Sequence, residues 1–159
     1  MIALVVAGAP PAGLGERAAA VHEVLVARTL AVAREAAARV EVAATVAAAL
    51  ALADPGPLLV LPAISPRLGD AHVAAAVADL EGGCDAVYGP TLEGDWYLAA
   101  LATPRPELLE GNPFTVAREH RVEVGLLRHE RALRTPADAA AFLADPLTPA
   151  DVRAALSAA

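Results

Sequence analysis

The sequence contains no lysine, and its twelve basic residues are all arginine. A P-loop lysine, a Schiff-base lysine and a lysine general base are therefore excluded. Aromatic residues make up only 3% of the chain, so its core must be packed from small and branched aliphatic side chains. Cys84 is the single cysteine and has no internal disulfide partner, which fits a reducing, cytoplasmic compartment.

Positive charge is also scarce. The net charge is -7 and the isoelectric point is near 5.0, whereas a nucleic-acid partner favours a basic face. No apolar run is long enough to span a membrane, and no basic region precedes the apolar N-terminal segment as in a signal peptide. We therefore expect a cytoplasmic protein with neither nucleic acid nor membrane as a partner. The 57% hydrophobic content leaves room for a homo-oligomer or a partner protein.

Strands and helices are expected to alternate along the chain. The predicted strands are IALVV, RVEVAA, LLVL, CDAVY, WYLAALA and VEVGLLR. The predicted helices are Glu16–Ala38, TVAAALALAD, Asp70–Glu81, PELLEG, TVAREHR, TPADAAAFLAD and TPADVRAALSA. In the last two, we expect Thr to cap the helix, Pro to take its first position and Asp its third. This alternation predicts a single α/β domain over residues 1–159, in three α/β/α layers around a mostly parallel sheet.

Three loops should meet beyond the carboxyl ends of the strands, where ligands bind in such sheets. Loop one is Gly8–Gly15, loop two is Pro62–Leu68 and loop three is Gly89–Asp95. The glycines and prolines of loop one let backbone N–H groups approach a phosphate, although such punctuation is also ordinary between a strand and a helix. Arg17 could steer an anion there, and Glu16 opposes it.

Loops two and three differ in acidic residues. The strand end at loop two offers Ile64 and Ser65 but no carboxylate for a divalent ion, and Asp70 fits the start of the next helix. In loop three, Glu93 and Asp95 flank Gly94, which suits a tight turn.

Trp96 and Tyr97 should then point to opposite faces of a strand. One of them could form an aromatic platform for a sugar or base, and the other would join the core. A turn with solvated acids and one packed aromatic is the alternative.

The order of these motifs resembles a small bacterial GT-A-type transferase family of uncharacterised function, which is similar to molybdenum-cofactor and phospholactate guanylyltransferases. Its members show K-A-P-x-P-G-x-x-K-T-R-L, then G-x-D-x-P-x-L, G-P-x-x-D-G-G-Y-Y-L-x-G-L and D-V-D-T-P-E-D-L. The stretch GPTLEGDWYLAAL matches the third pattern most specifically. The resemblance covers nearly the whole chain and implies a GT-A-like, Rossmann-like fold for nucleotide-diphospho-sugar or nucleotidyl transfer.

The matches to this family lie mainly at residues that shape the backbone. They are Ala9, Pro10, Gly13, Pro66, Leu68, Gly89, Pro90, Gly94, Tyr97, Leu98, Leu101, Thr135, Pro136 and Asp138.

The departures from the family lie mainly at charged residues. Gly8 and Glu16 stand at the two lysine positions, and Ile64 stands at the metal-binding aspartate. In the third pattern Glu93 replaces Asp, Asp95 replaces Gly and Trp96 replaces Tyr. Ala132 and Arg134 take the places of the two leading aspartates in the last pattern.

These departures predict a divergent nucleotide-sugar or nucleotidyl transferase-like protein without ordinary metal-dependent catalysis. It would bind a nucleotide, a nucleotide sugar or a partner protein as a pseudoenzyme. The candidate binding residues are Gly8, Pro10, Gly13, Arg17, Glu93, Gly94, Asp95, Trp96 and Arg134. No catalytic residue is identified, and no cofactor or metal is expected.

Two alternatives stay open. The first is an active glycosyltransferase or nucleotidyltransferase that holds Mg²⁺ or Mn²⁺ through Glu93 and Asp95 and binds phosphate through Arg17 or Arg134. The second is a structural or regulatory subunit, which a long exposed aliphatic patch would favour.

Overall fold

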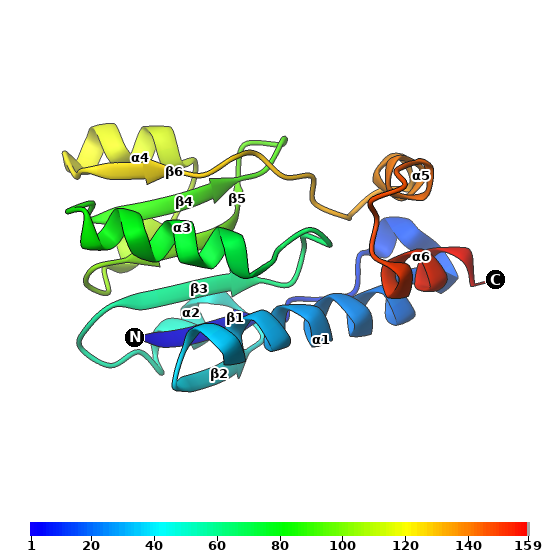
Figure 1. Cartoon of the computed structure of the whole chain (residues 1–159), viewed down its shortest axis with the longest axis horizontal. Helices are drawn as coiled ribbons and strands as arrows, with labels where there is room; N and C mark the ends of the chain where they lie inside the picture. The colour runs from blue at the N-terminus through cyan, green and yellow to red at the C-terminus, as the bar shows by residue number, and fades with distance from the viewer. Residues whose placement is uncertain (159) are drawn as a thin grey trace.

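One six-stranded sheet organises residues 1–158, the part of the chain that the computed structural model describes (Figure 1). The strands are β1 (Ile2–Val6), β2 (Arg39–Ala43), β3 (Leu58–Pro62), β4 (Ala86–Pro90), β5 (Trp96–Leu101) and β6 (Val124–Leu126). They lie in the order β2-β1-β3-β5-β4-β6. Only β5 runs antiparallel to its neighbours among these six, so the predicted mostly parallel sheet is confirmed.

Helices cover both faces of the sheet, which confirms the predicted three layers. They are η1 (Ala12–Arg17), α1 (Ala18–Ala36), α2 (Val46–Leu50), α3 (Asp70–Glu81), η2 (Pro106–Leu109), α4 (Pro113–His120), α5 (Pro136–Ala144) and α6 (Ala150–Ser157). Alternate residues of β1 enter different cores: Leu4 packs towards α2, η2 and α4, whereas Val5 packs towards α1 and α3. Both cores consist mainly of aliphatic side chains, as the composition predicts.

The hairpin from β4 to β5 contains an irregularity that sets the direction of two aromatic rings. The pairing shifts between Gly89 and Pro90, and the ring of Tyr97 covers Gly89 so closely that an added Cβ would lie 2.4 Å from the Tyr97 Cζ. Trp96 packs into the core on the α2 side, and Tyr97 packs into the core on the α3 side. The prediction that these neighbours point to opposite faces is confirmed.

Helices α5 and α6 form a separate small layer against the first half of α1, beyond the carboxyl edge of the sheet (Figure 1). Thr135 caps α5, and its side chain exchanges hydrogen bonds with Asp138, as predicted. The predicted Thr148 cap of α6 is wrong. Pro149 holds the N-cap position, and the Thr148 hydroxyl donates instead to the carbonyl of Phe142, at 2.6 Å.

Three predicted elements are shorter than their sequence patterns. The predicted helix at 16–38 is shorter at both ends: residues 16–17 belong to η1, which is kinked at Gly15 (φ 58°, ψ -133°), and α1 spans Ala18–Ala36. Only five residues of TVAAALALAD are helical, since the chain must return to β3. β6 keeps three residues of VEVGLLR, because only these pair with β4. Within residues 1–158, no helix combines the length and the hydropathy that a membrane crossing requires.

Candidate functional site

Two adjoining hollows lie at the carboxyl edge of the sheet, where the three loops meet. One has a volume of about 360 Å³ and lies against loop one; the other has about 590 Å³ and lies against loop three. Four residues line both hollows: Val6, Pro62, Ile64 and Arg134. The predicted meeting of loops one, two and three is confirmed, and we call the combined depression the crevice.

The loop-one hollow is mostly apolar. Its wall consists of Ala7, Gly8, Ala9, Pro11 and Ala12 from the loop, together with Leu25, Ala63 and Leu133. His22 of α1 adds the one imidazole of this lining, and Arg134 adds a guanidinium. Gly8 has φ +66°, a conformation that favours glycine, and no heavy atom lies within 4 Å of an added Cβ. The hollow therefore offers flat apolar contact with few charges.

The loop-three hollow is more polar. It is lined by Glu93, Gly94, Asp95, Trp96 and Asn112. Gly94 has φ +94° and closes the hairpin, and its carbonyl accepts a hydrogen bond of 2.9 Å from Asn112 Nδ2. Because Asn112 also caps α4 by accepting from the Phe114 N–H, α4 holds loop three in place.

Trp96 does not form an open aromatic platform. Its side chain is only 7% exposed, because β5 has already entered the sheet at this residue and its ring packs into the core. Trp96 lines part of the loop-three hollow, but its 7% exposure leaves too little of the ring for a base or sugar to stack on it.

Arg134 stands between the two hollows and is held from several sides. Its Nη2 lies 2.5 Å from Asp95 Oδ2, and the Thr91 hydroxyl donates to Asp95 Oδ1. Its backbone N–H donates to Asp138 at the start of α5. Gly13 lies directly beneath, since an added Cβ would lie 2.9 Å from the Arg134 carbonyl oxygen. Loop one, loop three and α5 thus converge on this arginine.

Asp138 fixes the chain that carries Arg134. Burial raises the pKa of Asp138, but hydrogen bonds from Thr135, Arg131 and the backbone N–H groups of Arg134 and Thr135 outweigh it and lower the pKa below its ordinary value of 3.8. The carboxylate therefore stays ionised and keeps the start of α5 rigid. The chain before α5 is thereby held in one position, and the Arg134 side chain that it carries lies at the crevice.

Three of the candidate residues do not line either hollow: Gly13, which packs beneath the Arg134 backbone, Pro10 and Arg17. Pro10 is exposed and lies between lining residues of loop one. Arg17 donates to the carbonyl of Leu156 at 2.9 Å and so ties η1 to α6, because the kink at Gly15 turns it away from the crevice. The geometry does not place Arg17 where it would steer an anion into the hollows.

Two lining residues with polar side chains were not among the candidates. His22 is half-buried on α1 and lines the loop-one hollow. Asn112 precedes Pro113, and this pair is the signature of a helix start, which could have identified the cap though not its contact with loop three.

The crevice does not fit an ordinary divalent metal site. Ile64 and Pro62 occupy the strand end, and Asp95 is paired with Arg134. Mg²⁺ and Mn²⁺ favour several carboxylate oxygens, which leaves Glu93 as the one carboxylate of this lining without a cationic neighbour at the site. Across residues 1–158, no three His, Cys, Asp or Glu side chains gather as a metal site.

A second polar cluster lies behind loop three, inside the protein. His72 Nε2 lies 3.2 Å from Glu130 Oε1, and the Arg128 Nε lies 2.7 Å from the same oxygen. The His72 and Glu130 side chains are each 6% exposed. The Gly69 N–H donates to His72 Nδ1, and His72 Nε2 lies within hydrogen-bonding distance of both Glu130 Oε1 and Arg128 Nε. This cluster joins the start of α3 to the chain before α5.

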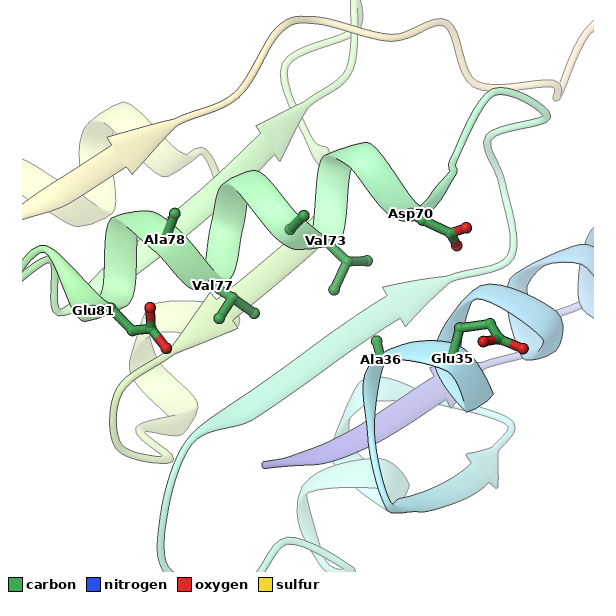
Figure 2. Close-up of a pocket in the computed structure, with 8 residues that line it drawn as sticks. Glu35, Ala36, Asp70, Val73, Val77, Ala78 and Glu81 are labelled. Carbon is green, nitrogen blue, oxygen red and sulfur yellow. The ribbon is translucent and has the colours of Figure 1, made fainter.

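A groove also runs between α1 and α3 on one face of the molecule, away from the crevice (Figure 2). Its volume is about 380 Å³ and its floor consists of alanine and valine side chains, including Val73 and Val77. Figure 2 shows Glu35 and Asp70 towards one end and Glu81 at the other. The lining combines three carboxylates at its ends with alanine and valine between them and contains no histidine, cysteine or cationic side chain.

Known structures share this fold. A protein provisionally named nucleotide-diphospho-sugar transferase, from Desulfovibrio desulfuricans G20, aligns with a TM-score of 0.61 and 15% identity, over 98% of this chain and 92% of its own. Rv0371c from Mycobacterium tuberculosis H37Rv aligns with a TM-score of 0.59 and 16% identity, over 91% of this chain and 98% of its own. No protein-family model matches the sequence, and no curated protein matches it significantly. The chain therefore has a nucleotide-diphospho-sugar transferase-like fold.

Proposed function

We propose that the crevice binds a nucleotide or nucleotide sugar, with Arg134 as the phosphate-binding group and without a metal ion. The protein would act as a ligand-binding pseudoenzyme of transferase-like fold. The observation that carries the proposal is the position of Arg134, which lines both hollows at once. A guanidinium there reaches a diphosphate whose two ends extend into the two hollows.

The two hollows suit different parts of such a ligand. The apolar wall of loop one fits the faces of a base, with His22 able to bond a polar edge. The loop-three hollow presents Glu93, Asp95 and Asn112, whose oxygen atoms accept hydrogen bonds from sugar hydroxyl groups. The fold comparisons support the same ligand class, since one neighbour is provisionally named for nucleotide-diphospho-sugar transfer.

A calorimetric titration tests the proposal directly. UDP, GDP, CDP and ADP are added to the protein with and without Mn²⁺. We expect at least one of these nucleotides to bind, with the same affinity in the presence and in the absence of Mn²⁺. The Arg134→Gln variant should weaken that binding about tenfold or more, since a charge-assisted phosphate contact is lost. Arg118→Gln is the matched control, because Arg118 is an exposed arginine on α4 away from the crevice lining.

The same titration separates the competing functions. Binding that strengthens with Mn²⁺ would favour an active transferase in which Glu93 and Asp95 hold the metal. Binding of no nucleotide under either condition overturns the proposal and favours a structural subunit, for which the apolar groove between α1 and α3 is the candidate surface.

A gain-of-function variant tests the register of the family resemblance. Ile64 and Arg134 line the same two hollows, so two aspartates at these positions would face one crevice. The double variant Ile64→Asp/Arg134→Asp is expected to bind Mn²⁺ where the wild-type protein does not. A folded double variant with no gain in Mn²⁺ affinity would count against the register.

A further inference from the structure

The guanidinium of Arg134 is paired with a side-chain carboxylate in the crevice. The Asp95 carboxylate lies 2.5 Å from its Nη2 and comes from loop three, whereas Arg134 comes from the chain before α5. The two residues are 39 positions apart, so this pair closes the crevice from opposite walls. Both residues line the loop-three hollow, so a ligand phosphate that bonds Arg134 from that hollow competes with Asp95.

The position of Asp95 is fixed by the hairpin rather than by Arg134 alone. The Thr91 hydroxyl donates to its second oxygen, and the Thr91 N–H donates to its backbone carbonyl at 2.8 Å. The carboxylate is therefore directed at the arginine even before the pair forms. The pair is also accessible to water, with 46% of the Asp95 side chain and 36% of the Arg134 side chain exposed.

An exposed pair of this kind can be exchanged. Its two partners attract each other only modestly, because water screens them and rehydrates each when they separate. A phosphate group carries more charge than a carboxylate and bonds the guanidinium in the same planar manner. A singly charged anion gains nothing over the resident carboxylate and is also repelled by it.

From this geometry we infer that Asp95 is the specificity-determining residue of the crevice. It pairs with Arg134 when no ligand is bound, and only an anion of higher charge, such as a diphosphate, displaces it. The inference rests on the proposed function and adds the class of anion that the site selects. When the diphosphate binds, Arg134 exchanges its carboxylate partner for phosphate oxygens, and Asp95 stays tied to Thr91.

Inorganic pyrophosphate is the probe that tests this exchange, measured by calorimetry at low salt. Asp95→Asn keeps an oxygen that accepts from Thr91, so the hairpin is preserved while the competing charge is lost. The variant should bind pyrophosphate about tenfold more tightly than the wild type. Excess acetate should weaken pyrophosphate binding by the variant several-fold and leave the wild type unchanged. Glu119→Gln, which removes one exposed acid on α4, is the control for net charge.

A double-variant cycle ties the effect to Arg134. On an Arg134→Gln background, Asp95→Asn should give no gain in pyrophosphate affinity, because no guanidinium is left to release. The inference is overturned if Asp95→Asn binds pyrophosphate no more tightly than the wild type, or if Glu119→Gln gains as much affinity as Asp95→Asn. Nucleotide binding by the wild type would still support the proposed function in that case. Binding of neither pyrophosphate nor nucleotide by any of these proteins would overturn both.

Discussion

Two charged clusters lie on either side of loop three, and they differ in their access to water. Asp95 and Arg134 form a half-exposed pair in the crevice, whereas His72 and Glu130 form a pair inside the protein that is 6% exposed at each partner. Both join loop or strand ends that are distant in sequence. Burial makes the inner pair expensive to break and the outer pair easy to exchange. The inner cluster therefore stabilises the fold, whereas the outer pair can separate when a ligand binds.

The largest effect is expected when the inner cluster loses its acid. Glu130→Ala leaves the buried His72 ring without its carboxylate partner, whereas Arg128 is 70% exposed and can be hydrated, so the variant should lower the free energy of unfolding by about 1–3 kcal/mol. Urea denaturation measures this loss. Glu119→Ala is the control and should change the value by less than about 0.5 kcal/mol. A loss at Glu130 as small as that of the control would remove the distinction between the two clusters.

An intermediate effect on stability is expected at Asp138, a buried residue in the first turn of α5 whose carboxylate accepts hydrogen bonds. Asp138→Ala removes the N3 half of the capping box of this helix and the bonds from Arg131 and Arg134, and should cost about 1–2 kcal/mol of stability at neutral pH.

The effect at Asp138 should depend on pH. The pKa of Asp138 lies below its ordinary value of 3.8 in the folded protein, so its contribution is complete above that value and is lost as the pH falls through the folded pKa. The stabilities of wild type and variant should thus converge in acid. A difference that stays constant down to the acid transition would contradict this account.

The smallest effect on stability is expected at the outer pair. Asp95→Asn should change the free energy of unfolding by less than about 1 kcal/mol, since exposed ion pairs contribute little. Added salt should reduce even this difference, whereas the loss in Glu130→Ala should persist because buried charges are poorly screened. Chemical denaturation at two salt concentrations provides the measurement. A salt-resistant loss of several kcal/mol at Asp95 would mean that the pair is structural and cannot be exchanged.

Much of the fold could be predicted because its signals are local. The buried strand IALVV and the helix Asp70–Glu81 have patterns that specify them without knowledge of their partners. The order of the strands and the reversal of β5 depend on pairing between distant segments, which no local pattern contains. The start of α1 shows the limit of a local pattern, because the helix was predicted from Glu16 whereas residues 16–17 belong to η1 and α1 begins at Ala18.

The site was predicted in its location and only partly in its members. Loop three was expected at this edge because the carboxyl ends of the strands meet there, and the family resemblance added Arg134 to the candidates. The ion pair between Asp95 and Arg134 could not be predicted, since it depends on the direction of two side chains from different loops. Burial of Trp96 was missed because its register in β5 depends on the irregularity at Gly89 and Pro90.

The reversed direction of β5 has a consequence for how such a protein can diversify. Because β4 and β5 are joined directly across the crevice, the chain between Pro90 and Trp96 is a short turn whose two ends are anchored in the middle of the sheet. Residues inserted at that turn would extend over both hollows as a roof and leave every strand pairing intact. New ligand preferences can thus arise at this one position without a change in the rest of the scaffold.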